Sequence, residues 1–152
     1  MALQIVVPDA SVILKWVLPS EDESDSESAL VLRTAIVQER VRALVPSLWV
    51  FEVGNTVSRR FPEHASQWMA AMMKFGLEEA QLSERWLTAT LELITRYGGT
   101  FYDAAYHAVA LVNGGVFITS DLKYIDKTTG DSAIVSLPLW RPPYARARPR
   151  GR

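Results

Sequence analysis

The sequence contains no cysteine and only two histidines, His64 and His107. Without cysteine the chain can form no disulfide, no thiolate zinc site and no cysteine nucleophile. Two histidines also argue against an all-histidine metal site within one chain, so a bound metal would be held mainly by oxygen. No apolar run approaches the ~20 residues that a membrane span needs, and the N-terminus lacks the basic segment and long apolar core of a signal peptide. We therefore expect a cytoplasmic protein.

The composition, 49% hydrophobic and 22% charged over 152 residues, predicts one globular domain with a substantial core. A formal net charge of −1 conceals an acidic stretch at 21–27 and an arginine-rich end at 141–152. The acidic stretch is interpreted as the solvated start of a helix, with a partner-binding surface as the alternative. We expect residues 1–140 to form the domain and residues 141–152 a flexible Pro/Arg-rich tail, which either binds phosphates or only aids solubility.

Apolar periodicity and turn residues predict an α/β protein in which strands alternate with helices. Strands are expected at 3–7, 43–45, 116–118 and 133–135. Helices are expected at 11–18, about 24–40, about 47–60, 63–75, 83–97 and 102–113. The β-branched run of the first strand is typical of a parallel strand that is buried on both faces.

Two acids directly follow predicted strands. Asp9 ends the first strand region, with Ser11 two residues later, and Asp121 follows the 116–118 strand close to Thr119. In open α/β sheets the ligand crevice lies outside the carboxyl ends of the strands. If these two strands are neighbours, their acids converge on one crevice. The alternative for each acid is that it only caps the helix that follows.

Two further acids lie in apolar surroundings. Glu52 has apolar neighbours at helical spacing, where an unpaired charge is costly to bury. Asp103 opens an almost wholly apolar helix, where the alternative is dipole stabilisation of ~0.3–1 kcal/mol. Carboxylates within ~4–6 Å of one another cannot all ionise without a compensating cation. Oxygen ligands indicate Mg²⁺ or Mn²⁺, which can activate water and stabilise the leaving oxygen at phosphorus. The four acids therefore predict phosphodiester hydrolysis.

Three other features leave alternatives open. His107 follows Asp103 by four residues, so it could be a metal ligand, although a buried structural histidine is the favoured interpretation. Asp126 is interpreted as a surface turn residue rather than an auxiliary acid. A Met-rich stripe belongs either to the core or to a contact with another helix or subunit; it comprises Trp68, Met69, Met72, Met73 and Phe75.

Four motifs together resemble a PIN domain and, more narrowly, the VapC toxins of prokaryotic toxin–antitoxin pairs. The motifs are VPDASVILKW at 7–16, PSL at 46–48 followed by Glu52 and Asn55, YDAAY at 102–106 followed by Ala108 and Ala110, and ITSD at 118–121. They occur in the family's order and spacing, and the resemblance covers about 3–137. Pro8 departs from it, because the family usually has an aliphatic residue there.

The resemblance implies a three-layer α/β/α fold with a central parallel sheet and the activity of an Mg²⁺- or Mn²⁺-dependent endoribonuclease. The family's acids match Asp9, Glu52, Asp103 and Asp121, which would be both catalytic residues and metal ligands. Its supporting polar positions match Ser11, Asn55 and Thr119. Family members usually form homodimers and are silenced by a VapB-type antitoxin.

Other functional classes fit the sequence less well. A haloacid-dehalogenase-like phosphatase needs a second Asp where Ser11 stands, and a Rossmann enzyme needs a glycine-rich turn that the sequence lacks after its first strand. An RNA-processing PIN nuclease without an antitoxin remains open. So does a non-catalytic RNA-binding protein on the same fold, because a fold does not determine activity.

Overall fold

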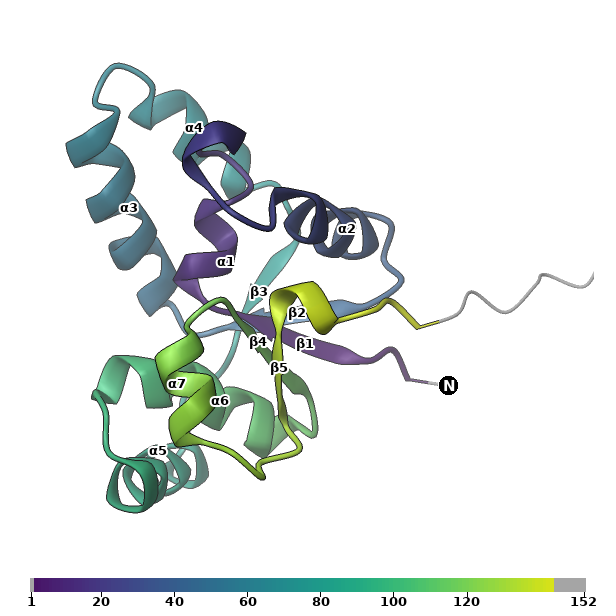
Figure 1. Ribbon diagram of the computed structural model, residues 1–152, viewed down its shortest axis with the longest axis vertical. Helices are drawn as coiled ribbons and strands as arrows, with labels where there is room; N and C mark the ends of the chain where they lie inside the picture. The colour runs from purple at the N-terminus through teal and green to yellow at the C-terminus, as the bar shows by residue number, and fades with distance from the viewer. Residues whose placement is uncertain (1, 144–152) are drawn as a thin grey trace, which may run out of the picture.

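A computed structural model, which describes residues 2–143, has a five-stranded parallel sheet at its centre (Figure 1). The strands are β1 (Ile5–Pro8), β2 (Arg42–Val45), β3 (Leu77–Glu79), β4 (Val116–Thr119) and β5 (Ile134–Ser136). Their order across the sheet is β3-β2-β1-β4-β5, and each neighbouring pair is parallel. The central strand β1 is therefore flanked by a hydrogen-bonded strand on each side.

Helices cover both faces of the sheet, so the three-layer α/β/α prediction is confirmed. The helices are α1 (Ala10–Leu14), α2 (Ser26–Val37), α3 (Leu48–Arg60), α4 (Ala65–Met72), α5 (Glu84–Tyr97), α6 (Phe101–Asn113) and α7 (Leu122–Lys127), with short 3₁₀ turns at Ser20–Asp22 and Leu137–Leu139. Figure 1 shows α1 to α4 above the sheet and α5, α6 and α7 below it.

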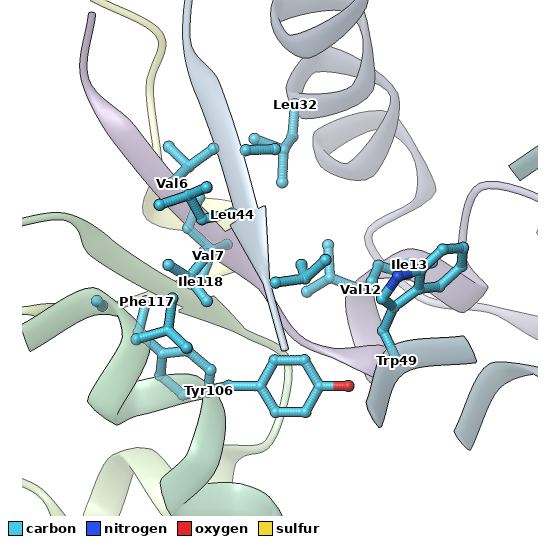
Figure 2. Close-up of a cluster of buried hydrophobic side chains, with 14 of the residues drawn as sticks. Val6, Val7, Val12, Ile13, Leu32, Leu44, Trp49, Tyr106, Phe117 and Ile118 are labelled. Atoms are coloured by element: carbon cyan, nitrogen blue, oxygen red, sulfur yellow. The ribbon is translucent and has the colours of Figure 1, made fainter. Parts of the chain in front are cut away.

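The core lies on both faces of β1 and β4. Val6 and Val7 are fully buried, and Val7 pairs with Phe117 of β4. Figure 2 shows these side chains packed between Leu32 of α2 and Tyr106 of α6. Burial on both faces explains why β1 is continuously apolar instead of alternating with polar residues.

The pairing of β1 with β4 brings together the segments that follow the two strands. Pro8 lies opposite Ile118, and the backbone N–H of Asp9 donates to the carbonyl of Ile118 at 3.2 Å. Pro8 is the last residue of its strand, where a missing N–H is tolerated. These two strands are therefore neighbours, which is the condition under which the acids that follow them are expected to converge, and the polar residues after them share one edge.

Helix α6 is held closely against this pair of strands. Thr100 caps its start, where the hydroxyl accepts from the N–H of Asp103 at 3.1 Å. Gly114 ends it with a φ of 64°, in the left-handed region. A Cβ on Gly115 would lie 2.8 Å from the carbonyl oxygen of Ile5. Glycine at this position therefore lets the chain enter β4 directly beside β1.

Two short elements were not predicted. Strand β3 has three residues, of which Glu78 and Glu79 are exposed at the edge of the sheet; charged side chains are common on edge strands and hide the alternation. Helix α7 has six residues and contains Asp126, which is exposed but helical rather than part of a turn. Neither segment is long enough to show a clear hydrophobic period.

In both the acidic stretch and the Met-rich stripe, the residues have different environments in the structure. Glu23 lies before α2 and pairs with the buried Lys15 ammonium at 3.0 Å, so the interpretation of the whole stretch as a solvated first helical turn is wrong. Met72 is fully buried, whereas Met73 is 64% exposed. The stripe therefore belongs partly to the core and partly to the surface.

The C-terminal segment still contacts the domain at its start. Trp140 is buried, and Arg141 donates to the carbonyl of Pro138 at 2.7 Å. The other arginines of the predicted tail, at 146, 148, 150 and 152, lie outside the described residues. None of the helices within residues 2–143 is long and apolar enough to cross a lipid bilayer.

Candidate active site

Asp9 lies where β1 passes into α1, and it is held by three hydrogen bonds. Its Oδ1 accepts from the Ser11 hydroxyl at 2.5 Å and from the backbone N–H of Val12 at 3.2 Å. Its Oδ2 accepts from the Thr119 hydroxyl, also at 2.5 Å. The two interpretations of Asp9 are therefore compatible, because the same carboxylate caps α1 and lies at the carboxyl end of the sheet.

The carboxyl of Asp9 has a strongly shifted pKa. Burial, which disfavours the charged form, raises the pKa of Asp9 from 3.8 to about 6. Hydrogen bonds from Ser11, Thr119 and Val12 act in the opposite direction, and repulsion by Glu52 raises the value further. The donors orient the carboxylate but do not compensate its charge.

The two hydroxyls also connect the ends of β1 and β4. Thr119 is fully buried, and its Oγ1 accepts from the N–H of Asp121 at 3.0 Å while donating to Asp9. The Ser11 Oγ accepts from the N–H of Ser120 at 3.3 Å. Each hydroxyl is thus a bridge between one strand end and the other, which fixes Asp9 relative to the segment that carries Asp121.

Glu52 lies on α3 and is bound by Tyr106 of α6. The Tyr106 hydroxyl donates to Glu52 Oε1 at 2.7 Å. Figure 2 shows the Tyr106 hydroxyl pointing out of the core toward the helix that carries Trp49. Burial raises the pKa of Glu52, the Tyr106 hydrogen bond opposes this, and repulsion from Asp103 adds to it. Burial and the same carboxylate also raise the pKa of Tyr106, so its hydroxyl stays protonated and donates.

The topology explains why these acids meet. Helix α3 begins three residues after β2 ends, at the carboxyl edge of the sheet. Helix α6 leads into the start of β4, so its own first turn, with Asp103, lies at the edge where β4 ends. Asp103 repels Glu52, and Glu52 repels Asp9, so these three carboxylates are neighbours. We call them the acid row. Within residues 2–143, no lysine or arginine makes an ion pair with any of the three.

Asp121 is arranged differently from the other acids. Its Oδ1 accepts from the N–H groups of Lys123 and Tyr124, at 3.1 and 3.2 Å, so it caps α7. Its backbone N–H reaches Asp9 only through the Thr119 hydroxyl. Asp121 therefore lies two residues beyond the end of β4, beside the three acids, and its carboxylate caps α7.

Two other residues that the sequence suggested as candidates, Asn55 and His107, make no side-chain hydrogen bond to the four acids. Asn55 is exposed on α3, and its side chain makes no hydrogen bond in the described part of the chain. His107 is fully buried: its Nδ1 lies 2.7 Å from the Tyr124 hydroxyl and its Nε2 2.9 Å from Asp131 Oδ2. Burial lowers the pKa of His107. Tyr124 engages Nδ1, whereas Nε2 is buried beside Asp131 without a hydrogen bond among residues 2–143. This enclosure of the ring favours the structural interpretation over a metal ligand.

The donor set is that of a site for a hard divalent cation, although the ligands are not preassembled. Three neighbouring carboxylates without a basic partner are chemically suited to such a cation, which would relieve their repulsion. Among residues 2–143, however, no three His, Asp or Glu side chains are close enough together to hold a metal ion as they stand. Asp9 and Glu52 would have to converge on the ion from the positions described above.

The sequence interpretation did not identify Tyr106, Tyr124 or Asp131 as residues that support the site. Tyr106 follows Asp103 by three residues, a spacing that places both on one helical face, and this signal was available. Tyr124 and Asp131 contact His107 through tertiary structure alone. No local pattern in the sequence indicates these pairings.

Comparisons with known proteins agree with the fold. A family model described as the PIN domain matches residues 6–130. A search of curated proteins finds no match. Among solved structures, PAE2754 from Pyrobaculum aerophilum is 22% identical with a TM-score of 0.61, and the match covers 91% of this chain and 93% of that one.

Two further structures come from toxin–antitoxin systems. A toxin–antitoxin complex from Klebsiella pneumoniae is 13% identical with a TM-score of 0.63, covering 88% of this chain and 97% of that one. VapBC2 from Rickettsia felis, bound to a DNA fragment of its promoter, is 14% identical with a TM-score of 0.64, covering 88% and 98%. At these identities the similarity establishes the shared fold.

Proposed function

Because the chain belongs to the PIN domain family, we propose that it is a metal-dependent endoribonuclease that hydrolyses RNA phosphodiester bonds. One observation carries the proposal: Asp9, Glu52 and Asp103 are neighbouring carboxylates with no basic partner among residues 2–143. Repulsion from Asp103 raises the pKa of Glu52, and repulsion from Glu52 raises that of Asp9. Such an arrangement is unfavourable for a purely structural role, because the repulsion is uncompensated.

The metal would be held by Asp9, Glu52 and Asp103, with Asp121 at the neighbouring strand end. A bound Mg²⁺ or Mn²⁺ supplies positive charge that activates water and stabilises the leaving oxygen at phosphorus. The hydroxyls of Ser11 and Thr119 hold both oxygens of Asp9 in place, and the Tyr106 hydroxyl holds one oxygen of Glu52. These donors orient the carboxylates and leave the remaining lone pairs for the ion.

The proposal extends to a toxin of the VapC type, with a VapB-type antitoxin as partner and a homodimer as its assembly. Its support is the motif resemblance, together with fold similarity to structures described as a toxin–antitoxin complex and as VapBC2. Expression of the chain alone should arrest growth of a bacterial host, and co-expression with the product of an adjacent short reading frame should restore it. Growth that is unaffected by an RNA-cleaving protein would instead favour an RNA-processing nuclease.

Cleavage of a mixed set of structured and unpaired RNAs tests the nuclease itself. With Mg²⁺ or Mn²⁺ the wild-type protein should cut RNA internally, and EDTA should abolish cutting. Asp9→Asn and Asp103→Asn should each lose most activity, because each removes a charged ligand while nearly keeping the side-chain shape.

Asp126→Asn is the matched control, since Asp126 is an exposed acid on α7 and does not belong to the acid row. It should cut RNA as the wild type does. A folded wild-type protein that cuts no RNA with either metal, yet binds RNA equally well with and without Asp9→Asn, would contradict the nuclease proposal. That result would support the non-catalytic RNA-binding alternative.

A further inference from the structure

An apolar cleft of about 150 Å³ opens between the first turns of α3 and α6. Its lining includes Pro46, Leu48, Leu82, Trp86, Phe101 and Tyr102. Tyr102 is 59% exposed, Leu82 53% and Phe101 41%, so large apolar surfaces at the mouth of the cleft face solvent. None of the residues that line the cleft carries a formal charge at neutral pH.

The cleft lies one helical turn from the candidate active site. Leu48 and Tyr102 both line it, and each precedes by four residues one partner of the hydrogen bond between Glu52 and Tyr106. Four residues correspond to about one turn, or ~5.4 Å along each helix. Asp103 directly follows Tyr102. The cleft and the acids are therefore adjacent parts of one surface formed by α3 and α6.

The walls of the cleft are held firmly. The indole N–H of Trp86 donates to the carbonyl of Ala105 at 3.0 Å. Phe101 packs edge-on against the Trp86 ring, with centroids 5.8 Å apart and an interplanar angle of 81°. Because Trp86 is buried and hydrogen-bonded, it fixes the partly exposed Phe101 ring at the opening, which gives the cleft an aromatic wall in a fixed position.

The charge pattern indicates what the cleft holds. An occupant must be uncharged and apolar inside the cleft, yet carry a group suited to a cation-bound cluster of acids one turn away. A single nucleotide has both properties, since a neutral aromatic base is joined through one ribose to a phosphate. An apolar side chain of a protein would fill the cleft, but it would need a basic neighbour to complement the acids, whereas a nucleotide bound through the cation carries both groups in one unit.

We propose that this cleft is a subsite for one unpaired base of the RNA, next to the phosphate that is cut. The inference rests on the proposed nuclease function and adds a recognition element to it. A base in a duplex is stacked on both faces and cannot enter a cleft, so the site selects unpaired nucleotides. Stacking on an aromatic side chain is tolerant of sequence, because every base has a π-face.

Tyr102 is the residue to change, because it is the most exposed aromatic at the cleft. Tyr102→Ala should weaken binding of a short, unpaired, fluorescently labelled 2′-O-methyl RNA by about 5- to 100-fold, the loss expected for one stacked base. Tyr102→Phe keeps the ring and should bind within about twofold of the wild type. Fluorescence anisotropy in Ca²⁺ measures this affinity without cleavage.

Leu111→Ala is the matched control. Leu111 is 40% exposed on the same helix but outside the cleft, and its truncation should leave RNA affinity unchanged. Thermal unfolding of each variant shows whether it is folded. If Tyr102→Ala destabilises the domain, Tyr102→Leu provides the second test, because it keeps apolar bulk and removes only the flat ring.

An abasic oligonucleotide series identifies the base. One abasic position should weaken wild-type binding about as much as Tyr102→Ala does. Tyr102→Ala should bind that abasic oligonucleotide no more weakly than the wild type does, because both changes remove the same stacking contact. Equal affinity of wild-type protein and Tyr102→Ala for every oligonucleotide, while the wild type still cuts RNA, would overturn the cleft proposal and leave the nuclease intact. A wild-type protein that neither binds nor cuts RNA would overturn both.

A selective effect on a protein partner is the remaining outcome. If Tyr102→Ala leaves RNA binding unchanged but releases a co-expressed antitoxin, the cleft holds a protein side chain and the base proposal is wrong.

Discussion

At the scale of single residues, Asp9 combines two roles that usually occur separately. As a helix cap it accepts the N–H of Val12, and as a member of the acid row it faces the charge of Glu52. The hydrogen bonds of Ser11 and Thr119 make burial of this carboxylate tolerable without neutralising it. Burial and the charge of Glu52 outweigh these hydrogen bonds, and the pKa of Asp9 is therefore raised.

The raised pKa predicts how stability depends on pH when no metal is bound. Between pH 3.8 and about 6 the folded protein retains a proton on Asp9 that the unfolded chain has lost. The free energy of unfolding therefore falls as pH rises through this window, by at most about 3 kcal/mol at ~1.4 kcal/mol per pKa unit. Asp9→Asn lacks this titration. Denaturant unfolding in EDTA at several pH values should show the wild type losing stability relative to Asp9→Asn.

The same experiment at pH 7 with Mg²⁺ or Mn²⁺ supplies its control. A bound cation favours the ionised form of Asp9, so the metal should restore stability to the wild type and affect Asp9→Asn less. Parallel pH profiles of the two proteins in EDTA would show that Asp9 titrates normally.

At the scale of elements, α6 carries polar groups in two directions. Asp103 in its first turn and Tyr106 one turn further along both act on Glu52, while His107 lies in the core between Tyr124 and Asp131. The His107 ring also stacks on Phe117 of β4, with centroids 5.7 Å apart. This buried polar chain joins α6 to α7 and so fixes the segment that follows Asp121.

Tyr124→Phe should loosen α7 without disturbing the acid row. It removes the hydroxyl that His107 Nδ1 contacts, which should lower the free energy of unfolding by about 1–2 kcal/mol because a buried polar group loses its partner. Hydrogen exchange should show faster exchange of the α7 amides. Tyr97→Phe is the matched control, because Tyr97 makes no side-chain hydrogen bond within residues 2–143. Equal exchange in both variants would mean that the His107 chain does not hold α7.

At the scale of the whole molecule, the sheet order assembles the site from distant segments. Thr119 and Asp9 are hydrogen-bonded across 110 residues of sequence, and Tyr106 and Glu52 across 54. The parallel arrangement places the ends of β1, β2 and β4 at one edge, where α3 and α6 also begin. The site therefore depends on the pairing of β2, β1 and β4 and not on any one motif.

The arginine-rich end gives a prediction at the same scale. Deleting residues 144–152 removes four arginines, and it should weaken RNA binding and reduce the slope of log affinity against log salt, by up to ~0.7 for each phosphate that is no longer neutralised. The cut belongs after Pro143, since a cut after Leu139 would also remove the buried Trp140. Binding titrations at several salt concentrations measure the effect. An unchanged slope would assign these arginines to solubility alone.

The fold class, most of the elements and the identity of the candidate acids could be predicted from the sequence. Strong apolar runs such as 5–7 and 104–111 specify buried strands and helices wherever they occur, because burial of their side chains dominates folding. Turn and cap residues such as Thr100 and Gly114 then set the helix ends locally. The short elements β3 and α7 were not predicted, because segments of three and six residues are too short to show a hydrophobic period.

Which polar groups meet is a property of the folded chain. Folding places Tyr106 on Glu52, encloses His107 between Tyr124 and Asp131 in the core, and leaves Asp121 capping α7 beside the acid row. Hydrogen bonds and charge repulsion act over a few ångströms, and the sequence does not specify separations on that scale until the sheet order is known. The raised pKa of Asp9 has the same origin, because burial and the approach of Glu52 both arise from tertiary packing.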